Sequence, residues 1–178
     1  MPRRVVTGTN AAGRSIVVAD EELPPTAHSA SPANAYYPIW GADGRCRVPS
    51  DGSLPSVTTW FPPASGFRYL VAVFPPDSTA RSTEAGDVDL DAQRREMEEK
   101  FPGAAAVTEP GGMHTTQTVD VGLVLNGEIW LELDDGADVR LTRGDLVVQN
   151  GTRHAWRNRS AAECTMAFVL IGADPAAE

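Results

Sequence analysis

The chain has 178 residues, a formal net charge of −9 and a hydrophobic content of 42%, which favour one acidic globular domain with a proper core. This charge argues against a nucleic-acid partner, because affinity for phosphate backbones is built on basic patches. No apolar run is long enough to span a membrane, and the first residues lack the apolar core of a signal peptide, so we expect a cytoplasmic protein. The widely spaced Cys46 and Cys164 indicate neither a disulfide framework nor a metal-binding motif.

Residues 1–75 are expected to form strands and loops. Residues 3–8 and 14–20 are apolar runs separated by a turn that contains Asn10 and Gly13, a pattern that predicts a hairpin. Residues 67–74 give the strongest strand signal of this half, and the following prolines end it. His28 lies in a Pro/Ser/Ala-rich connection, where we expect an exposed loop residue without a chemical role.

Residues 76–110 are expected to form a loop and one short surface helix. The helix is predicted over residues 91–100, with Asp89 or Asp91 as its cap and Phe101 at its end. Its apolar face is narrow, so we expect a solvated helix. Because this segment directly precedes the next region, a lid over that region is an alternative role.

Residues 111–172 carry turn signals about every 8–12 residues, a rhythm typical of a β-sandwich or barrel. Side chains two apart in a strand share a face. His114, Thr116, Thr118 and Asp120 therefore point the same way in a regular strand, as do His154 and Trp156. Two imidazoles and a carboxylate that face a barrel interior from adjacent strands are a donor set for a divalent metal.

At these residues the chain resembles the cupin superfamily, in particular its small single-domain conserved-barrel members. One motif begins at Gly144 and Asp145 and continues through Gly151, His154 and Asn158, with Gln149 in the place of the usual proline. In the other motif, His114 and Gly127 match, Asp120 takes the place of a glutamate, and Thr116 takes the place of a second histidine.

The resemblance implies an all-β protein with a single cupin barrel, a double-stranded β-helix or jelly roll, over residues 1–178, with one short surface helix. It also implies one divalent transition metal (Fe, Zn, Ni, Mn or Cu) held by His114, Asp120 and His154, and a homodimer. The substitution of Thr116 and the shorter side chain of Asp120 leave open whether a metal binds and whether Asp120 contacts it directly. Otherwise Asp120 would bond the neighbouring threonines.

The resemblance further implies an enzyme that acts on a small carboxylate, phenolic or polyketide-like substrate by dioxygenase, decarboxylase or lyase/isomerase chemistry. We expect His154 and Thr116 as catalytic residues, and Trp156, Thr118 and Arg68 in contact with substrate. Packing is the alternative role for Trp156, and the sequence leaves open whether Arg68 faces inward. The alternative functions are a non-catalytic small-molecule-binding cupin and a metal-free isomerase of the epimerase type with His154 as base.

Overall fold

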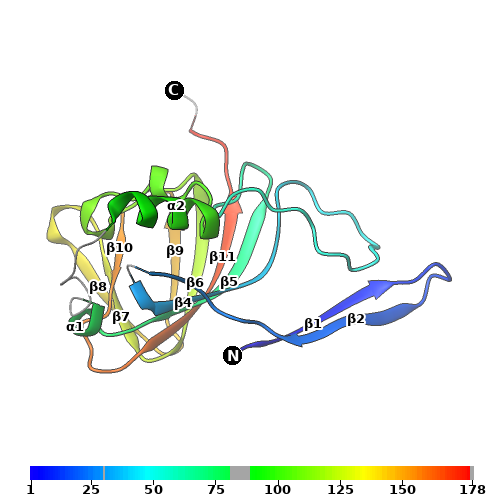
Figure 1. Ribbon diagram of the computed structural model, residues 1–178, viewed down its shortest axis with the longest axis horizontal. Coiled ribbons are helices and arrows are strands. Elements are labelled where there is room, and N and C mark those ends of the chain that lie inside the picture. The colour runs from blue at the N-terminus through cyan, green and yellow to red at the C-terminus, as the bar shows by residue number, and fades with distance from the viewer. Residues whose placement is uncertain (30, 81–88, 177–178) are drawn as a thin grey trace.

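The computed structural model describes residues 1–29, 31–80 and 89–176. Its largest element is a six-stranded antiparallel sheet in the order β3-β4-β5-β11-β6-β9, beside which lies a three-stranded sheet in the order β10-β7-β8 (Figure 1). The first sheet contains β3 (Thr26–His28), β4 (Ser31–Ala42), β5 (Phe67–Phe74), β6 (Thr118–Asn126), β9 (Leu146–Asn150) and β11 (Cys164–Gly172). The second contains β7 (Glu128–Glu132), β8 (Asp138–Thr142) and β10 (Ala155–Arg157). The predicted all-β barrel is confirmed.

Apolar side chains from both sheets meet in one core. In β11, alternate residues are buried, as the two-residue period of a strand requires. The buried residues of the core are Leu70, Ala72, Val124, Ile129, Leu131, Leu141, Cys164, Met166, Phe168 and Leu170. The turn from β6 to β7 needs Gly127, whose φ is +77° and where a Cβ would lie 2.5 Å from the carbonyl oxygen of Glu163.

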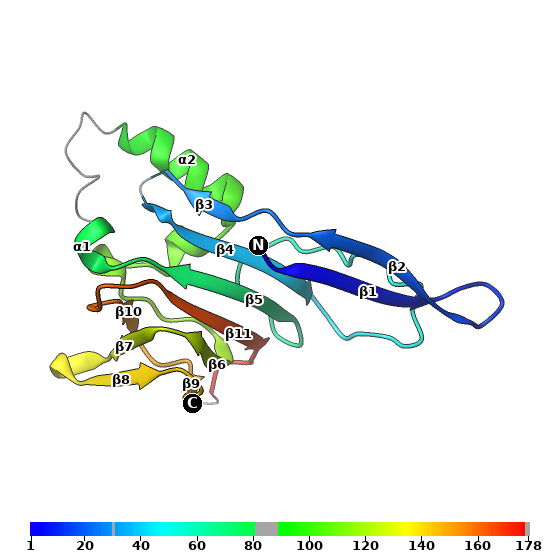
Figure 2. The same ribbon diagram turned by 90° about the horizontal axis from the view of Figure 1, so that it is seen from below.

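The predicted N-terminal hairpin is also present, as β1 (Arg3–Thr9) paired with β2 (Ser15–Glu22). Its turn is closed by Asn10, whose Oδ1 accepts hydrogen bonds from the backbone N–H groups of Ala12 and Arg14. The hairpin projects away from the two sheets (Figures 1 and 2). It is therefore an arm rather than a part of the barrel wall.

The helices are short. The predicted surface helix is α2 (Leu90–Lys100), which begins at Asp89, where a carboxylate oxygen accepts the N–H groups of Asp91 and Ala92. The remaining elements are α1 (Asp77–Ala80) and the 3₁₀ turns η2 (Ala104–Ala106), η3 (Pro110–Gly112) and η4 (Asp134–Gly136). Within the described ranges, no helix has the length and apolar composition that crossing a bilayer requires.

The prediction for His28 is wrong. This residue belongs to β3 and only 7% of it is exposed. Its Nε2 lies 3.0 Å from the carbonyl oxygen of Gln93 in α2, and the ammonium group of Lys100 donates to the carbonyl oxygen of Ala27 at 2.8 Å. The helix therefore packs along β3, the edge strand of the large sheet (Figure 2). The sequence gives no sign of this contact, because it joins residues 65 positions apart.

Candidate functional site

The structure brings together the two histidines that the sequence singles out. His114 and His154 lie opposite each other in an isolated antiparallel bridge. The N–H of each donates to the carbonyl of the other, at 2.9 and 3.0 Å. This double exchange holds the centroids of the two imidazole rings 4.2 Å apart.

Both imidazoles are oriented by hydrogen bonds to the backbone. His114 Nδ1 lies 3.0 Å from the carbonyl oxygen of Gly112, and His154 Nδ1 lies 2.8 Å from that of Thr152. A carbonyl oxygen only accepts, so each Nδ1 carries the proton and each Nε2 of the neutral ring keeps a free lone pair. The Arg157 guanidinium donates to the carbonyl of Gly111 at 2.7 Å and so holds the loop that positions Gly112.

The surroundings keep both rings uncharged. Burial, followed by the charge of His114, lowers the pKa of His154 to about 4. Burial also lowers the pKa of His114, against the bond to Gly112. Phe61 stacks over His114 with ring centroids 6.4 Å apart, and Trp156 meets His154 edge-on at 5.9 Å. Neutral imidazoles with free Nε2 atoms act as bases or as metal ligands.

The predicted hydroxyl and carboxyl groups lie on the inner face of the large sheet. Thr116 and Thr118 are buried, and their hydroxyl oxygens are 2.7 Å apart. Asp120 is 8% exposed, and burial raises its pKa to about 6, although a hydrogen bond from Thr118 opposes the shift. The predicted inward direction of Thr118 and Asp120 follows from the alternating burial of β6.

The donor set fits a metal ion incompletely. His114 and His154 offer two nitrogen ligands, whereas a catalytic metal site commonly uses three protein ligands. Across residues 1–29, 31–80 and 89–176, no three His, Cys, Asp or Glu side chains form a group that could hold one ion. Thr116, in the place of a second histidine, is already bonded to Thr118. The assignment of Asp120 as a third ligand stays a prediction.

Two of the other predicted residues have structural partners. Trp156 faces inward and packs edge-on against Phe168 with ring centroids 5.5 Å apart, so it serves both the core and the wall beside His154. Arg68 also faces inward and is 6% exposed. Its guanidinium donates to the Asp43 carboxylate at 2.5 Å and to the carbonyls of Ala42, Thr59 and Phe67. Contact of Arg68 with substrate stays a prediction.

Sequence reasoning missed two residues beside the site. Gln149 is 5% exposed and is the Cα partner of Asp120, and its Nε2 has no hydrogen-bond partner. Its inward direction is seen only in the burial pattern of β9, because residues 146–150 do not alternate between apolar and polar side chains. Phe61 carried no signal either, because it stands outside the strands and reaches His114 only through the fold.

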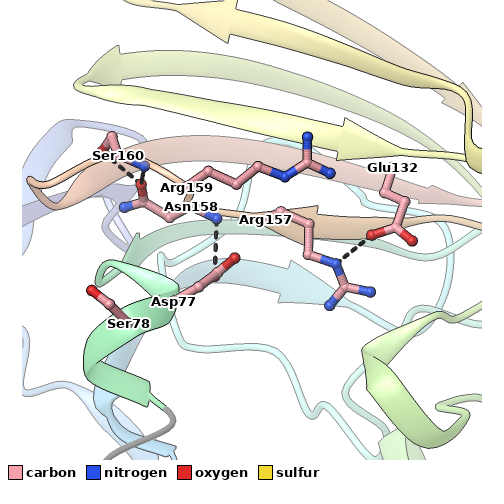
Figure 3. A pocket seen from close by; sticks show the side chains of 7 residues that line it. All are labelled: Asp77, Ser78, Glu132, Arg157, Asn158, Arg159 and Ser160. Carbon is pink, nitrogen blue, oxygen red and sulfur yellow. Dashed lines mark hydrogen bonds and ion pairs between the residues drawn. The ribbon is translucent and has the colours of Figure 1, made fainter.

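A pocket of about 460 Å³ lies away from the imidazole pair (Figure 3). Its lining residues are Asp77, Ser78, Glu132, Arg157, Asn158, Arg159 and Ser160. These groups are engaged with the protein itself: the Arg157 guanidinium donates to the Glu132 carboxylate at 2.5 Å, and Asp77 accepts the N–H of Asn158 at 3.1 Å. Arg159 pairs with Asp138. We therefore place the chemistry at the imidazole pair rather than here.

No protein-family model matches the chain. Phomopsin biosynthesis cluster protein C′ of Diaporthe leptostromiformis is 53% identical over 83 residues, which are 42% of this chain and 44% of that protein. Oryzines biosynthesis cluster protein J of Aspergillus oryzae is 43% identical over 83 residues, which are 42% of this chain and 46% of that protein. The chain thus matches about half of the length of these curated relatives, or less.

A cupin-domain-containing oxidoreductase of Neurospora crassa is 30% identical over 98 residues, which are 51% of this chain and 50% of that protein. Together with the two antiparallel sheets and the paired motifs, this likeness decides the fold. The protein has the cupin fold. Among solved structures, the cupin domain of Schizosaccharomyces pombe Cnp3 aligns with 97% of this cupin chain and 88% of its own, at a TM-score of 0.47 and 8% identity.

Proposed function

We propose that the protein is a cupin enzyme that converts a small organic substrate at the His114–His154 pair. One observation carries this proposal: a buried imidazole, His154, and a half-buried one, His114, stand side by side, with both Nδ1 atoms tethered to carbonyl oxygens and both Nε2 atoms left to bind a proton or a metal. The name of the Neurospora crassa relative, a cupin-domain-containing oxidoreductase, supports an enzyme. The relatives named for biosynthesis clusters support a small organic substrate.

The residues themselves are arranged for proton transfer. His154 Nε2 is a base whose ring cannot rotate without breaking its bond to Thr152. Its weak basicity, with a pKa of about 4, favours release of the proton once it has been taken up. The rings of Phe61 and Trp156 shield the pair from water, and the Thr116 hydroxyl can orient a substrate oxygen.

A metal-dependent form of the reaction would use the same nitrogens. A divalent ion held by His114 and His154 would polarise a substrate oxygen as a Lewis acid. The alternative form is a metal-free isomerase with His154 as base, for which two imidazoles suffice. The incomplete set of metal ligands favours this metal-free form. Both forms require the free Nε2 atoms.

Metal content separates the two forms. Protein purified without an affinity tag is analysed by plasma mass spectrometry beside His114→Ala, His154→Ala and, as a control, His28→Gln, which removes a histidine outside the pair. About one metal ion per chain, lost in the first two variants and kept in the control, supports the metal-dependent form. No metal after incubation with excess Fe(II) or Zn(II) supports the metal-free form.

Turnover then tests whether the protein is an enzyme. Small carbonyl and phenolic compounds are incubated with the protein in D₂O, and deuterium incorporation and O₂ consumption are followed. We expect one of the two signals in the wild type and its loss in His154→Ala. Neither signal, together with tight binding of a compound, would overturn the enzyme in favour of a non-catalytic small-molecule-binding cupin.

A further inference from the structure

Asp120 and Gln149 face each other across two neighbouring strands. They are Cα partners in the antiparallel pair of β6 and β9, and both point to the inner face of the sheet. Each is more than nine-tenths buried, with 8% of Asp120 and 5% of Gln149 exposed. Directly opposed residues have Cβ atoms about 4.5–5.5 Å apart, so the two side chains share one small space.

Each of these side chains has one polar atom bonded to the protein and one left over. Thr118 bonds the Asp120 carboxylate, and the Thr152 hydroxyl donates to Gln149 Oε1. Asp120 Oδ1 and Gln149 Nε2 are buried without a hydrogen-bond partner. The other neighbour of Asp120 in the sheet is Leu170, which offers no polar side-chain atom. Buried polar atoms rarely lack a hydrogen bond in proteins, because the free energy of removing such an atom from water is then not offset by a bond inside the protein.

We propose that Asp120 and Gln149 form one subsite that binds the edge of a carboxamide or lactam in the substrate. Asp120 Oδ1 accepts the N–H of that edge, and Gln149 Nε2 donates to its C=O. This pairing satisfies both orphan atoms with one ligand group. The inference rests on the proposed function, since it names a chemical group of the substrate that reaches the barrel interior.

Other ligand chemistries fit the pair less well. A carboxylate would be repelled by Asp120, and a hydrocarbon would leave both atoms unpaired. A trans peptide amide points its N–H and C=O to opposite sides, so one edge cannot meet both atoms. A primary carboxamide or a lactam places the two groups on the same edge.

The direct test is a titration of the isotope-labelled full chain with 2-pyrrolidinone, a small lactam, followed by NMR. We expect the Gln149 side-chain amide signals to shift in a saturable way. N-methyl-2-pyrrolidinone is the matched control compound, since it keeps the C=O but lacks the N–H. We expect it to bind about tenfold more weakly, the effect of losing one charge-assisted hydrogen bond.

Three variants separate recognition from a structural role, with backbone signals at positions 120 and 149 as the readout. Gln149→Met removes the donor at similar volume, and Gln149→Glu replaces it by an acceptor. We expect each to weaken lactam binding about tenfold or more. The double variant Asp120→Asn/Gln149→Glu exchanges the two roles and keeps the charge, so we expect it to regain most of the affinity. Asn150→Ala, which removes an outward-facing amide, is the control and should bind as the wild type does.

Two results would overturn the subsite: equal binding of both pyrrolidinones, or unchanged affinity in Gln149→Met. Lactam binding is read without turnover. A chain that binds the lactam but shows no His154-dependent reaction would contradict the proposed enzyme and keep the subsite, whereas the reverse pattern would contradict the subsite alone.

Discussion

The backbone N–H of His114 donates to the carbonyl of His154 at 2.9 Å, and the N–H of His154 donates to the carbonyl of His114 at 3.0 Å. The two imidazoles therefore belong to one antiparallel β-bridge. Neither residue belongs to a long strand, and the bridge is isolated. The spacing of the rings therefore depends on this one pair of bonds and on the carbonyls that hold each Nδ1. The predictions below begin with this pair.

We expect both histidines to be neutral, with the proton on Nδ1, at pH 7.5 in the presence of a chelator, and His154 to stay neutral down to about pH 5. Burial keeps the pKa of His154 near 4, and the charge of His114 lowers it further. In His114→Gln the charge of the neighbouring imidazole is gone, so the pKa of His154 should rise. Burial should still hold this pKa below 6.5. Long-range ¹⁵N–¹H NMR of the imidazoles measures both the tautomer and the titration. A proton on Nε2 would contradict the hydrogen bonds from each Nδ1 to the carbonyl oxygens of Gly112 and Thr152.

Between pH 6.5 and 4, His154 and Asp120 act in opposite directions on the stability of the wild type, and His114, whose pKa burial also lowers, acts in the same direction as His154. The free energy of unfolding should therefore fall only modestly on acidification. His154 has a pKa of about 4 against 6.5 when exposed, so only the unfolded chain takes up a proton in this window. Acidification then lowers the free energy of unfolding by about 3 kcal/mol. Asp120 has a pKa of about 6 against 3.8 when exposed, so the folded chain takes up the proton, and acidification raises that free energy by about 3 kcal/mol.

Single variants should reveal the two opposing contributions. In Asp120→Asn, only the histidine contribution remains, and the free energy of unfolding should fall between pH 6.5 and 4. In His154→Gln, the carboxyl contribution is opposed only by that of His114, whose pKa burial also lowers, so the free energy of unfolding should fall less on acidification than in Asp120→Asn. Urea unfolding with a chelator present, at several pH values, measures both slopes. If the free energy of unfolding changed with pH in the same way in both variants, the proposed opposition between the histidine and carboxyl contributions would be refuted.

His28→Ala should loosen helix α2. His28 Nε2 meets the carbonyl of Gln93, so its loss removes a hydrogen bond between β3 and α2, at a cost of roughly 0.5–1.5 kcal/mol. Gln93→Ala is the matched control, because it removes the side chain but keeps the carbonyl. Hydrogen exchange should show faster opening of α2 in His28→Ala only. Equal exchange in the two variants would mean that the contact does not hold the helix.

Arg68→Met should destabilise the fold rather than act on substrate alone. Its guanidinium bonds Asp43 and three backbone carbonyls: those of Ala42 in β4, Phe67 in β5 and Thr59 in the segment between these strands. Losing a buried, paired guanidinium costs roughly 3 kcal/mol or more. Chemical denaturation compares this variant with Arg45→Met, an exposed arginine in the same segment. Weaker substrate binding at unchanged stability would instead support the predicted substrate contact.

The outer face of the large sheet carries a row of exposed apolar side chains. Tyr69, Val169, Val121 and Val148 are consecutive partners across β5, β11, β6 and β9, and each is at least 36% exposed. Ile171 and Leu146, which are also exposed, lie in the neighbouring rows on the two sides of this one. At the ordinary spacings of a sheet, the row and these two neighbouring rows cover roughly 400 Å². An interface that buries roughly 800 Å² per partner has an apolar centre of about this size.

We propose that this face joins two copies of the chain, because a second copy offers the same uncharged surface. Light scattering or sedimentation should show a dimer in the wild type. Val121→Lys, in the middle of the row, should dissociate it. Val139→Lys, an equally simple change at an exposed valine of β8, should not. A monomeric wild type at high concentration would refute the proposal.

The sequence predicts what depends on near neighbours. The hairpin follows from the turn at Asn10, helix α2 follows from the cap at Asp89, and the inward direction of Thr118 and Asp120 follows from the period of a strand. Each of these signals lies within a few residues of its effect, so one sequence is enough to read it.

Contacts between distant segments were beyond the sequence. The burial of His28 requires α2 to lie along β3, and two acceptors of Arg68, Asp43 and Thr59, come from a loop that the strand pattern does not place. The opposition of Gln149 and Asp120 depends on the register of β6 and β9. The grouping of His114, Asp120 and His154 as metal ligands rests on spacing along the chain and on the resemblance, and it stays a prediction.

Strand β11 is the last strand of the chain, and it pairs with β5 on one side and β6 on the other. During synthesis, β5 and β6 therefore leave the ribosome long before the strand that joins them. Until then their unpaired edges and apolar faces are exposed to other chains. The barrel can close only after β11 has left the ribosome, so we expect the yield of folded protein in cells to depend on chaperones that shield the strands made before it.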